Sequence, residues 1–294
     1  MRLAMLTPAP DYGVPHDWAF ETQAEALREA GAEVAAVPWT EAEDLDRFDL
    51  ILPLVTWGYH LKHERWLEFL DRLEAERLPV ANPPAMLRWN SDKAYLAELG
   101  RKGVPVVPTL EVDHLNEAAL AAAAGVLGVE ELVVKPPVSA SAWGTFRLHG
   151  QDSVPMEVHG RRMLIQPYVE SVTSSGEYSL ILFGGELSHT VAKLPKSGDF
   201  RVQPEWGGTN GAVEAPDGAL EIARAALAEA PGDATYARVD LLVGNDGGLQ
   251  VIELELIEPA LFLHCAPDAK PRFAEAVLSM ASSLRAHRSN PAPC

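Results

Sequence analysis

A hairpin near the end of the chain constrains the fold more than any other feature of the sequence. Two apolar segments, residues 236–243 and 249–256, flank the turn Asn245-Asp246-Gly247-Gly248, and a turn of this composition joins antiparallel strands. Pairing Gly244 with Leu249 fixes the register of the two strands. The sequence therefore predicts a hairpin in which every side chain is assigned to one of two faces.

One face of this hairpin carries four charged side chains. In the predicted register Asp240 lies opposite Glu253, and Arg238 lies opposite Glu255. Three carboxylates around one arginine suit Mg²⁺, which takes oxygen ligands and keeps water and phosphate oxygens in its remaining positions. A polar sheet face with cross-strand ion pairs is the alternative, and the hairpin alone favours neither. The other face is expected in a core and consists of Ala237, Val239, Leu241, Ile252, Leu254 and Leu256.

The first 85 residues alternate short apolar runs with helical patterns. Apolar positions recur at helical spacing within 17–30 and within 62–76. This alternation favours an α/β domain with a largely parallel sheet, and Pro83-Pro84 marks its expected end. Four runs are strand-like: residues 3–7, 33–39, 50–55 and 78–81.

Side chains that follow these strands are the candidates for contact with a substrate. In open parallel sheets, ligands lie beyond the carboxyl ends of the strands. Here those ends lead into residues 7–10 and 56–60. On topology alone, the expected substrate contacts are His16, Trp57, Tyr59 and His60, together with the segment Pro259 to His264.

A second group of residues suits phosphate binding. An apolar strand ends at Lys135, and a loop of small residues follows, with Ser139, Ser141 and Gly144. Backbone N–H groups of such a loop can approach phosphate oxygens while the ammonium group neutralises their charge. A strand-end lysine before a flexible loop is the alternative. The chain contains neither Gly-x-x-x-x-Gly-Lys-Ser/Thr nor Gly-x-Gly-x-x-Gly.

Composition limits the class of protein. The 294 residues include 24 Lys and Arg and 42 Asp and Glu, a net charge of −18, which argues against a general binder of nucleic acid or anionic membranes. The two cysteines, Cys265 and Cys294, do not predict a disulfide scaffold. No apolar run is long enough for a signal peptide or a membrane span. These features together predict a cytoplasmic protein.

The order of the motifs resembles the ATP-grasp superfamily. Asn90-Ser-Asp-Lys93, in which Ser91 is expected to cap a helix, precedes Lys135, then Gln166-Pro-Tyr-Val169, and finally the charged hairpin. The resemblance covers about residues 85–265. It implies two nucleotide lysines, a loop over the phosphates, a hinge at the adenine and a glutamate at the ribose. The residues so implied for ATP are Lys93, Lys135, Ser139, Ser141, Gly144, Gln166, Tyr168, Val169 and Glu177.

The same resemblance implies roles for the charged hairpin. Asp240 and Glu253 match the family's metal carboxylates, whereas Glu255 stands where the family usually has asparagine in Glu-x-Asn. A glutamate still donates oxygen, and its extra charge should bind Mg²⁺ or Mn²⁺ more tightly. The cations implied for the γ-phosphate and the acyl phosphate are Lys193, Arg201 and Arg238.

The resemblance also implies a domain organisation. An N-terminal α/β domain with a parallel sheet, residues 1–85, is expected to precede a two-lobed ATP-grasp fold. Its small lobe is predicted at 86–165, with a mobile loop at 137–144. The second lobe, with the metal site, is predicted at 166–294.

The activity implied is that of an ADP-forming ligase. The family activates a carboxylate as an acyl phosphate, which an amine of the same or a second molecule then attacks. The run Glu253 to Pro259 is similar to that of the cyclo-ligase group of D-cycloserine biosynthesis and of bacterial glutathione-synthetase-like ligases. The expected substrate is a small amino-acid-like molecule, with no nucleic-acid or membrane partner; a homo-oligomer is expected only because dimers are common. Two alternatives remain: a ligase that adds an amino acid to a peptide or protein tail, and a nucleotide-binding regulatory module without catalysis.

Overall fold

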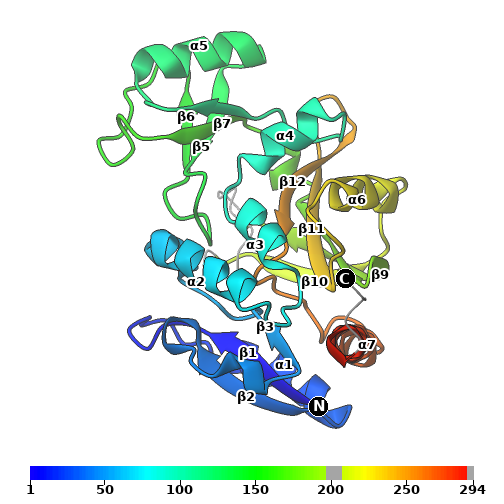
Figure 1. Ribbon diagram of the computed structural model, residues 1–294. Helices are drawn as coiled ribbons and strands as arrows, with labels where there is room; N and C mark the ends of the chain where they lie inside the picture. The colour runs from blue at the N-terminus through cyan, green and yellow to red at the C-terminus, as the bar shows by residue number, and fades with distance from the viewer. Residues whose placement is uncertain (197–206, 290–294) are drawn as a thin grey trace.

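Three β-sheets follow one another along the chain in the computed structural model, which describes residues 1–196 and 207–289. Figure 1 shows the N-terminal sheet at one end of the molecule, a four-stranded sheet at the other end and a five-stranded sheet between them. This arrangement confirms the predicted α/β architecture, in which a parallel sheet precedes two further lobes.

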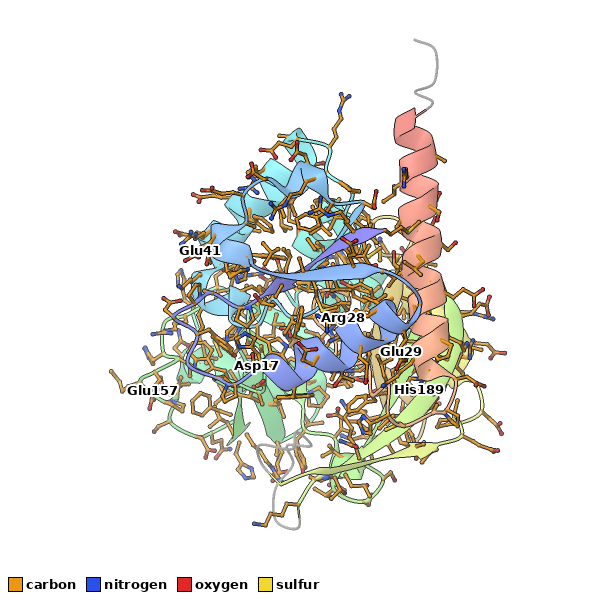
Figure 2. The ribbon with its side chains drawn as sticks, turned by 90° about the horizontal axis from the view of Figure 1, so that it is seen from below. Asp17, Arg28, Glu29, Glu41, Glu157 and His189 are labelled. Atoms are coloured by element: carbon orange, nitrogen blue, oxygen red, sulfur yellow. The ribbon has the colours of Figure 1, made fainter. Side chains whose placement is uncertain are left out.

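The N-terminal sheet is parallel, with the order β2-β1-β3. Leu3 and Met5 of β1 point to one face and pack against α1 and α7, whereas Ala4 and Leu6 point to the other and pack against α2. Figure 2 shows α7 beside α1 on the first of these faces. The bounds are β1 Arg2–Thr7, α1 Asp17–Glu29, β2 Glu33–Pro38, β3 Leu50–Leu52, α2 His63–Ala75 and α7 Ala269–Ser289, with 3₁₀ turns η1 Trp39–Glu41, η2 Leu45–Arg47 and η3 Tyr59–Lys62.

The four-stranded sheet is antiparallel, with the order β4-β7-β5-β6, and helix α5 covers one face of it. Helix α5 begins where Asn116 accepts a hydrogen bond from the backbone N–H of Ala119 at 2.9 Å. The bounds are β4 Leu110–Val112, α5 Glu117–Leu127, β5 Glu131–Lys135, β6 Phe146–His149 and β7 Met163–Pro167.

The five-stranded sheet is also antiparallel, with the order β10-β9-β8-β11-β12. Its apolar face packs against α4 and α6, and part of the opposite face packs against α7. The remainder of that opposite face is polar and holds the candidate site. The bounds are α3 Pro84–Asn90, α4 Tyr95–Arg101, η4 Glu170–Thr173, β8 Glu177–Phe183, β9 Glu186–Leu194, β10 Thr209–Val213, α6 Ala219–Ala228, β11 Tyr236–Val243 and β12 Leu249–Glu255.

The register of the β11–β12 hairpin is correct at the charged end and wrong at the turn. Asp240 pairs with Glu253 as predicted, but Leu249 pairs with Val243 and not with Gly244. A β-bulge at Ile252 restores the register between the two ends. The bulge turns Ile252 away from the predicted core, and Val251 takes its place there.

Two local expectations for the segment around Lys93 need correction or remain open. Ser91 does not cap a helix start, because it ends α3, and Lys93 lies in the turn between α3 and α4. Met86, Tyr95 and Leu96 of these helices pack on the five-stranded sheet, so the predicted lobe boundaries at 86 and 166 stay a prediction. Within the described residues, no helix is long and apolar enough to cross a membrane.

Candidate active site

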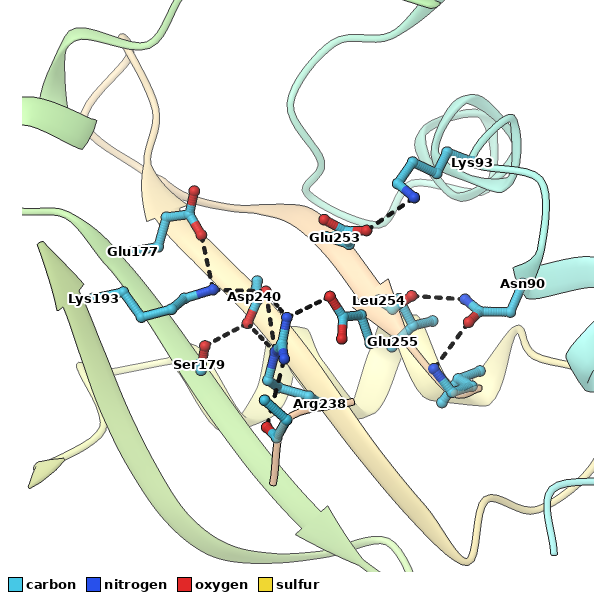
Figure 3. Close-up of polar contacts among 12 residues, drawn as sticks. Asn90, Lys93, Glu177, Ser179, Lys193, Arg238, Asp240, Glu253, Leu254 and Glu255 are labelled. Atoms are coloured by element: carbon cyan, nitrogen blue, oxygen red, sulfur yellow. Dashed lines mark hydrogen bonds and ion pairs between the residues drawn. The ribbon is translucent and has the colours of Figure 1, made fainter. Parts of the chain in front are cut away.

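Arg238 of β11 is the central cation of the polar sheet face. Its guanidinium donates to both carboxylate oxygens of Asp240, with distances of 2.9–3.2 Å, and also to the carboxylate of Glu255 (Figure 3). Arg238 and Asp240 are almost fully buried, at 7% and 2% exposure. Both charges therefore lie where the dielectric is low and where an unpaired charge would be costly.

Lys193 of β9 approaches the same carboxylate from the neighbouring side. Its ammonium lies 2.9 Å from Asp240 and 3.0 Å from Glu177. Ser179 of β8 donates to the other oxygen of Asp240 at 2.5 Å. Gly176 allows this approach, since a Cβ there would lie 2.1 Å from the carbonyl oxygen of Lys193. Three strands thus converge on one carboxylate.

The protonation of the two carboxyl groups bound to Arg238 differs. Burial alone would raise the pKa of Asp240, but Arg238 and Lys193 hold that pKa well below its usual range. At Glu255 burial outweighs the effect of Arg238 and raises the pKa to about 7. Asp240 is therefore ionised at neutral pH, whereas Glu255 is present in both its protonated and its ionised form at that pH.

Glu253 belongs to a second ion pair, which joins β12 to the turn between α3 and α4. Its carboxylate lies 3.1 Å from the ammonium of Lys93, which also donates to the carbonyl oxygen of Ser139 at 2.6 Å. Burial raises the pKa of Glu253, but Lys93 and then Lys135 outweigh it and lower that pKa overall. Lys93 thus connects the hairpin to the loop expected to cover phosphates.

Lys135 is buried at the end of β5 and forms no ion pair or hydrogen bond with the described residues through its side chain. Burial lowers its pKa to about 8. The following loop is tightly folded: Ser139 donates to the carbonyl oxygen of Pro136 at 3.1 Å, and a Cβ on Gly144 would lie 2.9 Å from the Pro136 ring. Ser141 has a positive φ of 50° and is exposed. An unpaired lysine beside this loop suits an anionic ligand.

The predicted hinge joins the four-stranded sheet to the five-stranded sheet. The side chain of Gln166 donates to the hydroxyl of Thr109 at 2.8 Å, and Tyr168 lies beneath the guanidinium of Arg147, 3.6 Å from the ring centre. Val169 is buried with three apolar side chains, among them the Ile252 displaced by the bulge. The hinge is therefore apolar on the side that borders the polar sheet face.

The candidates from the N-terminal domain separate into two groups. Tyr59 is buried, and its pKa is raised by burial and by the nearby glutamates of β12 and the segment after it. His60 is half buried; burial and then Lys93 lower its pKa to about 4, and its Nδ1 is buried without a hydrogen-bond partner. Trp57 instead packs against Trp18.

The remaining candidates lack a described connection to the charged cluster or lie outside the described residues. His16 contacts the carbonyl oxygen of Val14 at 3.2 Å near the start of α1, and no described contact links it to the cluster. Arg201 falls within residues 197–206, outside the described residues. Their roles stay predictions.

Sequence reasoning missed the side chains that hold β12 in place. Asn90 donates to the carbonyl oxygen of Leu254 at 2.6 Å and accepts from the N–H of Leu256 at 2.9 Å (Figure 3). Tyr95 exchanges two hydrogen bonds with Leu254, both at 2.9 Å. Asn82, fully buried, donates to the carbonyl oxygens of Leu256 and Tyr236. No local sequence pattern indicates these contacts, because their partners lie more than 150 residues away.

Three carboxylates of the hairpin fit a divalent metal ion. One ligand atom from each of Asp240, Glu253 and Glu255 lies within 4.8 Å of the others. Carboxylate oxygens are the donors that Mg²⁺ prefers, and water and phosphate oxygens complete its shell. The set therefore suits a metal that also contacts a nucleotide.

Comparison with known proteins agrees with this geometry. Residues 3–82 match the sequence family described as "D-cycloserine synthetase DcsG, N-terminal domain". Over 94% of this chain and 97% of the relative, the sequence is 32% identical to cycloserine biosynthesis protein DcsG of Streptomyces lavendulae. The chain belongs to the DcsG family of ATP-grasp ligases. Bacterial glutathione synthetases are among its more distant relatives.

Solved structures of the DcsG family and of other ATP-grasp ligases share the fold. The crystal structure of D-cycloserine synthetase DcsG superposes with a TM-score of 0.83 at 30% identity, covering 96% of this chain and all of that one. D-alanine–D-alanine ligase from Bacillus anthracis complexed with ATP gives a TM-score of 0.66 at 17% identity, covering 98% and 99%. The second likeness concerns the fold alone.

Proposed function

We propose that this DcsG-family ligase activates the carboxylate of an O-ureido-serine-like amino acid as an acyl phosphate and forms an amide bond with a nitrogen of the same molecule. ATP-grasp relatives bind ATP and Mg²⁺. The observation that carries the proposal is the convergence of Asp240, Glu253 and Glu255 with three buried cations on one sheet face, beside the unpaired Lys135.

In the first step, residues of the chain position phosphate oxygens. Lys93, which contacts the carbonyl oxygen of Ser139, and Lys135, which ends β5 before this loop, would neutralise the charge of the nucleotide phosphates. Asp240, Glu253 and Glu255 would hold Mg²⁺, which supplies charge neutralisation at the transferring phosphoryl group. A carboxylate oxygen of the substrate bonds to the γ-phosphorus, the bond to the β-phosphate oxygen breaks, and ADP leaves.

In the second step, the nitrogen attacks the acyl carbon and phosphate leaves with the former carboxylate oxygen. The nitrogen loses one proton, which the leaving phosphate accepts, and Arg238 remains to stabilise the negative charge on the acyl phosphate and on the leaving phosphate. Such fixed donors act in a site of low dielectric and need little reorganisation. Phosphoryl transfer requires little covalent participation by the protein, so positioning and charge are sufficient.

An ADP-release screen tests the proposal. The purified chain is incubated with ATP, Mg²⁺ and amino acids that have hydroxylamine-type side chains, with O-ureido-serine as the leading probe, and products are identified by mass spectrometry. ADP release together with an intramolecular amide supports the proposal. ADP release only with a peptide acceptor would favour the peptide-tail ligase, and ATP binding without ADP release under every mixture would favour a regulatory module. The cytoplasmic location and the oligomeric state stay predictions.

A further inference from the structure

Glu258 is a carboxylate in the site region that no role described so far uses. It follows β12 in the run Glu253-Leu254-Glu255-Leu256-Ile257-Glu258. Among the described residues its side chain has neither a hydrogen bond nor an ion pair. Burial, and then the charge of Glu255, raise its pKa to about 8. The carboxyl group of Glu258 is therefore protonated at neutral pH, and within the described chain it lacks the counter-charge that all three hairpin carboxylates possess.

Lys93 and Arg238, whose charges act on Glu258, already pair with other groups. Lys93 pairs with Glu253 and with a backbone carbonyl, and Arg238 pairs with Asp240 and Glu255. Glu258 also lies outside the group of carboxylates that fits a metal ion within the described chain. No cation of the described chain is therefore left for Glu258, and a cationic group of a ligand would supply the pairing charge.

The backbone around Glu258 is held in place by side chains from several elements. Tyr236 donates to the carbonyl oxygen of Ile257 at 3.0 Å, and Asn82 donates to that of Leu256 at 2.8 Å. Nε2 of His189 lies 3.0 Å from the carbonyl oxygen of Leu261, and Figure 2 places His189 near the start of α7. These contacts fix the backbone from which the partly buried side chain of Glu258 extends.

The same segment stores backbone strain next to the charged cluster. Phe262 adopts a positive φ of 45°, which a non-glycine residue rarely does, and its ring lies 5.9 Å from the guanidinium carbon of Arg238. Strain of this kind persists where the surrounding structure imposes it and is common at ligand sites. The segment also faces the N-terminal domain, since Ile257 packs in one apolar cluster with Tyr59 and Trp66.

We propose that Glu258 binds the α-ammonium group of the amino-acid substrate, between the N-terminal domain and the charged hairpin. The assignment rests on the proposed function. An ammonium group paired with this carboxylate stays protonated and cannot act as a nucleophile. Within one molecule the α-nitrogen could close only a strained three-membered ring, so the side-chain nitrogen forms the amide bond. Glu258 then determines the substrate class by selecting molecules that carry an α-ammonium group.

Binding measurements test this assignment without requiring turnover. Calorimetry with Mg²⁺ and a non-hydrolysable ATP analogue compares O-ureido-serine with its counterpart lacking the α-amino group, 3-(ureidooxy)propanoate. The native chain should bind the amino acid about 10- to 100-fold more tightly, in the range of one charge-assisted hydrogen bond. In Glu258→Gln this preference should fall to within about twofold, because only the amino acid loses affinity.

Two controls separate the roles that Glu258 could have. Exposed Glu275 on α7 provides a matched variant, Glu275→Gln, which should keep the full preference. The nucleotide affinity and the Mg²⁺ dependence of Glu258→Gln should equal those of the native chain. An unchanged preference in Glu258→Gln, or a weakened Mg²⁺ dependence, would overturn the assignment. Loss of the preference in a chain that releases no ADP would leave the assignment standing and refute the ligase proposal alone.

Discussion

Replacement of Arg238 by alanine perturbs the charged cluster most sharply. Arg238 is the only described cation that contacts both Asp240 and Glu255. In Arg238→Ala, Lys193 still pairs with Asp240, but Glu255 loses its ion pair. Breaking a buried pair typically costs about 3–5 kcal/mol where an uncompensated charge remains. Glu255, whose pKa is already about 7, can instead take up a proton, so the cost should be about 1–3 kcal/mol, that of an unsatisfied buried polar group. We therefore expect the free energy of unfolding of the metal-free chain to fall by about that amount.

The effect on catalysis should be separable from the effect on stability. Removal of one preorganised charge donor lowers turnover by about 100- to 1,000-fold. Because Arg238 competes with a metal ion for Asp240 and Glu255, its loss should not weaken Mg²⁺ binding. Saturating Mg²⁺ should accordingly restore more stability to Arg238→Ala than it adds to the native chain, since ligand binding stabilises the folded state.

Matched variants define the assay for this prediction. ADP release is measured at a temperature where circular dichroism shows each variant folded. Arg238→Lys keeps one positive charge but lacks the planar guanidinium that donates to two carboxylates at once. Its rate of ADP release should therefore lie between those of the native chain and Arg238→Ala. Arg224→Ala removes a surface arginine that pairs with Glu186 at 2.8 Å and should change stability by less than about 1 kcal/mol, without loss of rate. Native turnover in folded Arg238→Ala would refute the role given to this residue.

Two further predictions follow from buried polar groups. The pKa of Lys135, about 8 in the free chain because of burial, should rise beside phosphates. Calorimetry in buffers of different ionisation enthalpy measures the protons exchanged on binding of an ATP analogue. At pH 8.5 the native chain should take up more protons than Lys135→Met, and at pH 6.5 the two chains should not differ. Equal proton uptake at pH 8.5 would contradict the assignment. Asn82→Ala removes three buried hydrogen bonds and should lower the free energy of unfolding by about 3–5 kcal/mol. Asn116→Ala at the start of α5 should lower the free energy of unfolding by only about 1 kcal/mol. If Asn82→Ala and Asn116→Ala unfolded at the same denaturant concentration, the comparison would be contradicted.

The charged hairpin shows what local sequence patterns can predict and what they cannot. Alternation along the strands and one turn were sufficient to place Asp240 opposite Glu253. The pattern could not reveal the bulge. The predicted register is wrong by one residue at the turn, and the extra residue Ile252 compensates for this error before the charged residues are reached. A bulge depends on how the strand packs against its neighbours, here against the apolar hinge residue Val169.

Residues whose role depends on contacts with distant segments could not be identified from the sequence. Asn82 looks like an ordinary turn residue in the sequence, yet it is fully buried between segments 150 residues further on. Ser91 resembles a helix-capping residue and instead ends α3. Glu258 belongs to a run that was recognised for its similarity to a ligase group, but only the absence of a counter-charge in three dimensions singles it out.

The fate of the carboxylate oxygens tests the central claim most directly. O-ureido-serine labelled with ¹⁸O in its carboxylate is incubated with the native chain, ATP and Mg²⁺, and the released inorganic phosphate is analysed by mass spectrometry. Activation through an acyl phosphate transfers one ¹⁸O atom to each phosphate released, because the carboxylate oxygen leaves with the phosphoryl group. Phosphate that carries no ¹⁸O, released together with ADP, would contradict the account, since the γ-phosphate would then have been transferred to water.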